Sequence, residues 1–196
     1  MKNFVVGLLL FVLFSCSSSK IEMFPDSKIS YSSGDEILIT RLEGIKTYYA
    51  NDFYQNAVKV FSAHPSLKIV DESDMIYKFK TAGLELPGYD NYNKEVLKEM
   101  KEKFGLDFIL TSKLLSMVTE INDFPTRQAE IELKLYDLTA GIPTVVMKIK
   151  TTMPPAAYTD GQGTVYAANV NSSISAADKA YTKAIKKYYK AFKCCF

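Results

Sequence analysis

The segment 105–152 constrains the fold most strongly, because it predicts three consecutive strands that the rest of the chain must cover. Residues 108–110 are apolar on both faces, which is typical of a strand buried inside a sheet. The next two segments alternate between apolar and polar residues, so each has one buried and one solvated face. The inward-facing positions are Ile131, Leu133, Leu135, Val145, Met147 and Ile149.

The turn between the last two strands predicts their register. If Leu138 pairs with Ile142 across a three-residue loop, Gly141 takes the position that requires a positive φ. A slip of one residue would turn the apolar side chains to the wrong face. The predicted register forms two apolar pairs and two opposite-charge pairs: Leu133 with Met147, Leu135 with Val145, Glu132 with Lys148 and Glu130 with Lys150.

Segments on both sides of these strands predict the remaining layers. Residues 36–42 and 67–70 indicate strands around a helix over 49–61, an order typical of a parallel pair with a right-handed crossover. Further helices are expected over 93–104 and 175–192. The predicted class is α/β (α+β): a single mixed sheet of about five strands with a parallel strand-helix-strand start, an antiparallel meander and packed helices that include a carboxyl-terminal amphipathic helix.

The ends of these two helices carry capping signals. Asn93 is expected to cap the first of them, and Gly105 to terminate it. Ser175 and Asp178 form an approximate capping box at the start of the second.

The amino terminus has the pattern of an export signal. Lys2 precedes an apolar run over 4–14, which is much shorter than the roughly 20 residues that span a bilayer. Leu13, Ser15 and Cys16 then resemble the lipobox of bacterial lipoproteins, in which the cysteine is diacylated after cleavage. The alternative is an ordinary secretory signal followed by a chance cysteine.

The lipobox divides the chain into segments. We expect a signal peptide over 1–15, a lipidated polar tether over 16–34, a single globular domain over 35–193 and a tail over 194–196. Removal of Lys2 with the signal lowers the net charge from +2 to +1, which indicates no nucleic-acid partner.

Lipidation would place the protein on a membrane of the cell envelope. One acyl chain binds only marginally, so two or three chains on Cys16, palmitate among them, would be needed for a stable anchor. Ser17 stands where an aspartate would resemble an inner-membrane retention signal. This favours the outer membrane, with the protein facing the periplasm.

The sequence offers little for catalysis, and no cofactor or metal is expected. His64 is the only histidine and precedes Pro65, so it predicts a solvated residue at a helix end. This position does not indicate a histidine-based triad, and without a second histidine a zinc site is not expected either.

A group of acidic residues has two further interpretations. Asp71, Glu72 and Asp74 lie within four positions and could bind a divalent cation. The favoured alternative is a helix start capped by Ser73, with the acids at its positive end. A hydrolase that uses only carboxylates, from Asp71, Glu72 and Asp107, is a remaining alternative.

Two loops supply candidate partner-binding residues. Loop 83–93 is unusually apolar, and its large side chains either form an exposed partner site or cover the core. The connection 153–173 is long for a compact domain and is interpreted as a partner-binding flap, with a disordered loop or an extra edge strand as alternatives. The candidates are Leu86, Tyr89 and Tyr92 in the first loop and Tyr158 and Tyr166 in the second.

The carboxyl-terminal helix has a basic face. Such a face either lies on anionic lipid or is solvated, and we favour solvation because lysines late in a helix also complement its dipole. Cys194 and Cys195 beyond it either form a strained vicinal disulfide or link to another chain. The basic residues are Lys179, Lys183, Lys186, Lys187 and Lys190.

Two sequence blocks, 104–112 and 131–141, together with the order of strands and helices, resemble the curli-secretion lipoprotein family (CsgG-like). The same core is similar to the lipoprotein activators of penicillin-binding proteins (LpoB-like) and to the amino-terminal domain of TolB. The resemblance covers about residues 35–192. It implies an envelope lipoprotein that assembles or activates partners and is not an enzyme.

Two departures narrow what the resemblance implies. Residues 44–48 are too few for the constriction loop of a secretion pore, and 17–34 is short for the tether of a synthase activator. We therefore predict a lipid-anchored, non-enzymatic accessory or adaptor that binds membrane lipid through Cys16 and also binds another envelope protein. A self-assembling secretion-pore component is the alternative, so a homo-oligomer is possible.

Overall fold

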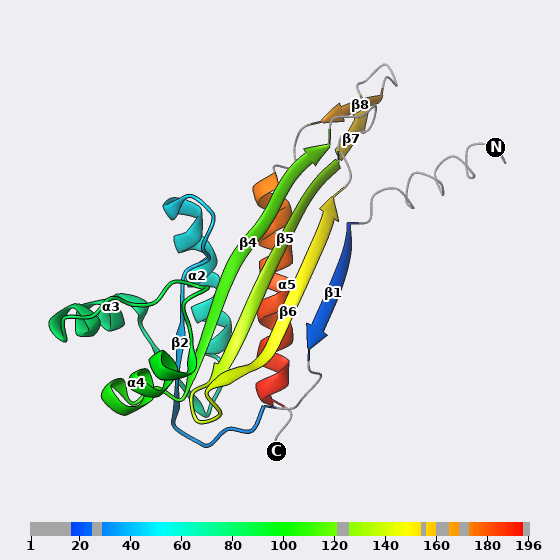
Figure 1. The fold of residues 1–196 in the computed structure, drawn as a ribbon. Coiled ribbons are helices and arrows are strands. Elements are labelled where there is room, and N and C mark those ends of the chain that lie inside the picture. The colour runs from blue at the N-terminus through cyan, green and yellow to red at the C-terminus, as the bar shows by residue number, and fades with distance from the viewer. Residues whose placement is uncertain are drawn as a thin grey trace.

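The computed structural model describes residues 17–24, 29–120, 126–153, 156–159, 165–168 and 173–193. A six-stranded mixed sheet runs through the molecule, and a short two-stranded sheet lies beyond one end of it (Figure 1). The elements are β1 (Ser18–Phe24), β2 (Asp35–Ile39), α2 (Thr47–Phe61), β3 (Leu67–Val70), α3 (Glu72–Thr81), α4 (Lys94–Phe104), β4 (Phe108–Glu120), β5 (Thr126–Asp137), β6 (Ile142–Met153), β7 (Ala156–Thr159), β8 (Val165–Ala168) and α5 (Ser173–Lys193).

The main sheet has the strand order β1-β6-β5-β4-β2-β3. β2 pairs in parallel with both β3 and β4, whereas the neighbouring pairs from β4 to β1 are antiparallel. The predicted class is confirmed, including the parallel strand-helix-strand start and the antiparallel meander. The sheet has one strand more than the five or so expected.

The additional strand, β1, corrects the tether predicted over 16–34. Residues Ser18–Phe24 pair along their whole length with β6, with Ile21 opposite Ile149 and Met23 opposite Met147. Ile21 and Met23 pack against the main core. The flanking serines suggested a polar linker, but the period-2 alternation of this short segment dictates a strand.

One face of the sheet packs against α2 and α5, which lie behind it in Figure 1. The apolar positions predicted on β5 and β6 all point to this face and are fully buried. Alanines and aromatic residues of α5 cover them, as the helical spacing predicted. The α5 residues at this interface include Ala177, Tyr181, Ala184, Ile185, Tyr188 and Phe192.

The β5–β6 hairpin confirms most of the predicted register. The pairs Leu133 with Met147, Leu135 with Val145, Glu132 with Lys148 and Glu130 with Lys150 all form, and Gly141 has φ +68°.

The end of the hairpin was predicted wrongly. Ile142 pairs with Asp137 instead of Leu138, and the register shifts next to Leu135. The Asp137 carboxylate accepts hydrogen bonds from the backbone of Thr139 and Ala140, which closes the turn one residue earlier. The resulting mismatch is absorbed as a bulge beside Pro143, a residue without a backbone donor.

The opposite face of the sheet is covered only in part. A second core cluster forms where α3, α4 and the loop between them meet the β2–β4 end, with Leu38, Ile109 and Tyr136 as its sheet residues. Asn93 caps α4 through a bond from Val96 N, and Gly105 ends it with φ +73°, both as predicted. In Figure 1 these helices lie to one side, away from β6 and β1.

The carboxyl-terminal helix α5 begins earlier than predicted. It starts at Ser173, so Ser175 and Asp178 lie inside the first turns and not at the predicted N-cap position. Its basic face is partly engaged, because Lys183 Nζ donates to Ser19 Oγ of β1 at 2.8 Å. Within the described ranges, no helix is both long and apolar enough to cross a membrane.

Candidate functional site

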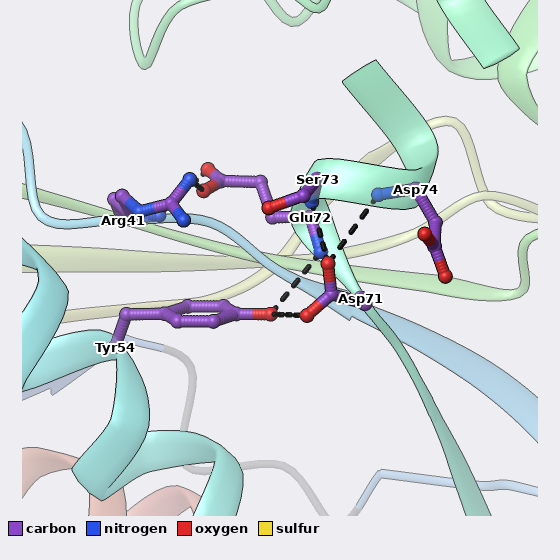
Figure 2. Close-up of polar contacts among 6 residues, drawn as sticks. All are labelled: Arg41, Tyr54, Asp71, Glu72, Ser73 and Asp74. Carbon is purple, nitrogen blue, oxygen red and sulfur yellow. Dashed lines mark hydrogen bonds and ion pairs between the residues drawn. The ribbon is translucent and has the colours of Figure 1, made fainter. Parts of the chain in front are cut away.

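A polar cluster forms where β2 and β3 end. These strands are parallel neighbours, so the residues that follow them meet at one edge of the sheet: Arg41 after β2 and Glu72 after β3 (Figure 2). Arg41 donates its backbone N–H to Glu72 Oε1 at 2.8 Å, and its guanidinium forms an ion pair with Glu72 Oε2. The Glu72 side chain is 7% exposed and that of Arg41 is 31% exposed. The pair therefore joins two loops at the boundary between core and solvent.

Asp71 and Tyr54 complete this cluster (Figure 2). Asp71 Oδ1 accepts from the backbone N–H of Ser73 at 2.8 Å and of Asp74 at 3.3 Å, which makes Asp71 the N-cap of α3. The prediction that Ser73 caps this helix is wrong, since the cap lies two residues earlier. The acidic residues do lie at the positive end of the helix, as expected.

The Tyr54 hydroxyl contacts both acidic residues of the cluster, the carboxylate of Asp71 and the backbone of Glu72. It donates to Asp71 Oδ2 at 3.0 Å and accepts from the backbone N–H of Glu72 at 3.1 Å. The guanidinium of Arg41 lies over the tyrosine ring, 5.1 Å from its centroid. α2, which carries Tyr54, is thereby fastened to the start of α3.

The adjacent carboxylates have opposite pKa shifts. Burial raises the pKa of Glu72 above its ordinary value, and Arg41 offsets only part of this effect. Burial also pushes the pKa of Asp71 upward, but the hydrogen bonds from Tyr54 and from the backbone of Ser73 and Asp74 outweigh it and lower the pKa. Burial raises the pKa of Tyr54, which stays protonated as a donor.

The three carboxylates proposed for a hydrolase are not brought together. Asp107 precedes β4 near Glu36, whose backbone N–H it accepts at 3.0 Å, and it also forms an ion pair with Lys101. Asp71 follows the residue that pairs with Leu38, about 10 Å further along the sheet at roughly 3.3 Å per residue. Within the described ranges, no group of three or more acidic, histidine or cysteine residues is placed to hold a metal ion.

A second polar cluster lies on the sheet face opposite α2 and α5. Tyr89 donates its hydroxyl to Glu132 Oε1 at 2.6 Å, and Lys148 Nζ lies 3.2 Å from Glu132 Oε2. Lys134 lies over the Tyr89 ring, 4.2 Å from the centroid. Burial pushes the pKa of Glu132 upward, but the bonds from Tyr89 and Lys148 outweigh it and lower the pKa.

This cluster is one part of a larger surface, which we call the charged face. Strand pairing places Glu132, Lys148 and Glu22 in one row across β5, β6 and β1, and Glu130, Lys150 and Lys20 in the next row. Alternating signs lie beside one another in the first row, so it forms favourable cross-strand pairs. The charged face consists of Lys20, Glu22, Glu130, Glu132, Lys148 and Lys150.

The first loop of predicted partner-binding residues lies against the sheet. Tyr89 and Tyr92 are buried, and Leu86 is half-buried against the second core cluster. Tyr92 packs on Tyr136, with ring centroids 5.4 Å apart. The prediction that these tyrosines form an exposed partner site is therefore wrong, and the alternative, that they cover the core, is what the structure has.

The second loop forms a hairpin apart from the main sheet. β7 and β8 pair antiparallel, with Tyr158 directly opposite Tyr166. In the described part of this loop, β7 and β8 form a two-stranded sheet of their own and add no edge strand to the main sheet. A partner-binding role for Tyr158 and Tyr166 stays a prediction.

His64 is buried, which corrects the solvated position predicted for it. Its ring lies among those of Tyr31, Tyr189 and Phe192, at centroid distances of 5.2, 5.7 and 6.4 Å. Nδ1 accepts from the backbone N–H of Ser66 at 3.3 Å. The end of α5 closes over this position, a long-range contact that the local sequence does not reveal.

Several predicted features lie outside the described residues. These are the cleavage-site residues Leu13 and Ser15, the lipidation site Cys16, and the carboxyl-terminal Cys194 and Cys195. Their assignments stay predictions.

The sequence interpretation missed two central residues of the clusters, Tyr54 and Glu132, and gave Arg41 no role. A signal was available for Arg41, because the residues after two parallel strands share one edge of the sheet. For Glu132, the predicted register placed it opposite Lys148, but it did not reveal that Tyr89, from a loop, donates a hydrogen bond to it. Tyr54 was hidden at helical spacing among apolar residues.

Comparisons with known proteins relate the fold to solved structures. No family model matches the chain, and no curated protein matches it. The hypothetical protein CT253 from Chlamydia trachomatis is 9% identical with a TM-score of 0.51, and the match covers 84% of this chain and 100% of that one. Its similarity is one of fold.

Bacterial lipoproteins are among the other similar structures. Lipoprotein GNA1162 from Neisseria meningitidis is 13% identical with a TM-score of 0.49, covering 78% of this chain and 99% of that one. The LpoB C-terminal domain from Escherichia coli is 13% identical with a TM-score of 0.41, covering 62% and 85%.

Proposed function

We propose that this protein is a lipid-anchored adaptor of the bacterial cell envelope that binds another envelope protein through its charged face. The partner's process would be assembly, secretion or cell-wall synthesis. The observation that carries the proposal is that one face of the sheet is sealed by α2 and α5, whereas β5, β6 and β1 present charged side chains on the other.

The charged face has the chemistry of a protein-binding surface. The three lysines and three glutamates that define it balance in charge, and Lys134 beside them adds one positive charge, so no strong field toward nucleic acid or anionic lipid is expected. Mixed charges in fixed rows instead favour a partner with the complementary pattern. Lys148 and Lys150 are exposed and available for such contacts.

The polar clusters support a non-enzymatic role. The carboxylates of Asp71, Glu72 and Glu132 accept hydrogen bonds from the protein itself, and each joins two structural elements. A general acid or base needs an atom that can donate or accept a proton and that faces a substrate site. These residues serve instead to hold loops on the sheet.

The amino terminus supports a lipid anchor. Leu13, Ser15 and Cys16 match the lipobox pattern, and β1 begins only two residues after the cysteine. Acyl chains on Cys16 would therefore hold the edge of the sheet close to the membrane surface. We place the protein on the outer membrane, facing the periplasm, because Ser17 follows the cysteine.

Metabolic labelling tests the anchor. Cells that express the full chain are grown with radioactive palmitate, and the protein is followed in membrane and soluble fractions. The wild type should incorporate label and remain in the membrane fraction, whereas Cys16→Ala should incorporate none. Ser17→Ala is the matched control. A labelled Cys16→Ala variant, or an unlabelled wild type, would contradict the anchor.

Co-purification tests the adaptor role. The tagged full chain is extracted in mild detergent and compared with a Lys148→Glu, Lys150→Glu variant of the charged face. A Lys186→Glu, Lys187→Glu variant of exposed α5 positions is the control for charge. A second envelope protein should be retained by the wild type and the control and lost with the charged-face variant. Equal retention by all three would reject this surface.

A further inference from the structure

The outer edge of β1 is an open sheet edge in the described part of the chain. β1 and β3 end the sheet on its two sides, and β1 is the longer, with seven residues against four. One side of β1 pairs with β6, and no other described strand pairs with the outer side. Such an edge presents backbone N–H and C=O groups that can extend the sheet with another strand.

Symmetry restricts how two copies of β1 can pair. A two-fold axis perpendicular to the sheet keeps each side chain on its own face, so residues opposite one another must share a face. Antiparallel pairing must then be centred on a residue. Centring on Lys20 sets lysine opposite lysine, and centring on Glu22 sets glutamate opposite glutamate, both unfavourable.

Centring on Ile21 gives a self-complementary register. Lys20 then lies opposite Glu22 of the second copy, and the symmetry repeats this pair. All seven residues of β1 are paired in this register and in no other. We propose that the protein forms a two-fold symmetric dimer in which β1 pairs antiparallel with β1 of a second copy, centred on Ile21.

The central side chains of β1 suit this interface on both faces. Those of Lys20 and Glu22 are 77% and 42% exposed, so both can reach charges across the edge, where the pairs with the second copy would replace or share the ion pair that they form with each other. On the helix side, Ile21 and Met23 are half-buried against the main core, and a second copy would cover them further. The dimer would also join two charged faces into one continuous surface.

Charge reversal gives a direct test. The full-length protein is purified in mild detergent, and its mass is measured by native mass spectrometry over a range of concentrations. Lys20→Glu and Glu22→Lys each place like charges opposite one another in the dimer. Each single variant should dimerise more weakly, on the order of tenfold or more.

Two further samples show whether a single variant dimerises weakly because of like charges at the interface or because it is misfolded. An equimolar mixture of Lys20→Glu and Glu22→Lys should form a heterodimer, because opposite charges face each other again at both pairs. The double variant Lys20→Glu, Glu22→Lys should dimerise like the wild type. Recovery in the mixture also shows that both single variants are folded.

Several results would overturn the dimer. They are a wild type that stays monomeric at about 100 μM, single variants that dimerise as tightly as the wild type, and a mixture that stays monomeric. A different protein bound to the wild type in place of a second copy, and lost in Glu22→Lys, would also overturn it by assigning the edge to another partner.

Discussion

The two faces of the sheet differ in how they are covered. On the α2–α5 face, Ile131, Leu133 and Met147 are fully buried beneath two helices. On the opposite face, α3 and α4 cover only the β2–β4 end, and Lys148 and Lys150 stay exposed. The same strands supply both faces, because successive side chains point in opposite directions. Most of the buried apolar surface thus lies on one face, and the other face carries polar and charged side chains.

The polar clusters follow the same division. Arg41, Tyr54, Asp71 and Glu72 fasten the helices to the sheet edge, and Tyr54 and Glu72 are buried there. On the charged face, by contrast, Glu132 is held by the buried Tyr89, whereas Lys148 and Lys150 are exposed. Buried charges are retained for structure, and exposed ones remain available for recognition.

The largest expected effect is on the covered face. Leu133→Ala removes a fully buried side chain and should lower the free energy of unfolding by about 2–5 kcal/mol. Val146→Ala, on the opposite face of the neighbouring strand, should lower it by less than about 1 kcal/mol. Urea denaturation of both variants measures the difference. Equal losses would break the distinction between the faces.

Breaking the Arg41–Glu72 pair should have the next largest effect. Arg41→Met leaves the Glu72 carboxylate buried without its cation, and should cost about 2–3 kcal/mol at neutral pH, less than for a fully buried pair. The loss should shrink in acid, because protonated Glu72 needs no cation. Lys68→Met, which removes the exposed ion pair with Glu36, is the control and should cost less than about 1 kcal/mol. Similar losses in both variants would refute the structural role.

Gly141 offers a test of the hairpin turn. Its φ of +68° is unfavourable for a β-branched residue, and a Cβ there would lie 3.3 Å from Lys94 Cγ. Gly141→Val should lower the free energy of unfolding by about 1–3 kcal/mol. Gly141→Asn, which tolerates this backbone conformation, should lose less. An unchanged melting midpoint for Gly141→Val would contradict the turn geometry.

Opposite pH dependences are expected from Asp71 and Glu72. The lowered pKa of Asp71 means that its stabilising contribution is present above its unfolded pKa, near 3.8, and is lost as the pH falls. The raised pKa of Glu72 means that its contribution is present below its unfolded pKa, near 4.5, and is lost as the pH rises.

Two conservative variants separate these contributions. Between pH 7 and pH 3, Asp71→Asn should lose less stability than the wild type, whereas Glu72→Gln should lose more. Urea denaturation at both pH values measures the slopes. If both variants lost more stability than the wild type, or both lost less, the opposite pKa shifts of Asp71 and Glu72 would be contradicted.

Features that depend on residues close together in the chain could be predicted from the sequence, whereas features that depend on distant residues could not. The helix capped by Asn93 and ended by Gly105, and the Leu133–Met147 register, depend on local chemistry and on strand period, so the sequence alone predicts them. The burial of His64 depends on Phe192, which lies far away in the chain. Tyr89 likewise is fixed by Glu132, a contact that no local pattern signals.

Strand β1 was missed from the sequence for a different reason. Its alternation of Lys20, Ile21, Glu22 and Met23 is a strand signal, but it is short and follows serines that suggest a linker. Only its partner β6, more than a hundred residues later, explains why it is ordered into the sheet.

The most direct test of the two-face account is site-specific photo-crosslinking in cells that make the full chain. A photo-reactive residue replaces Lys150 on the charged face or, as the control, the exposed Gln55 on α2. We expect an adduct with a different envelope protein from position 150 and none from position 55. The same adduct from both positions, or from position 55 alone, would contradict it.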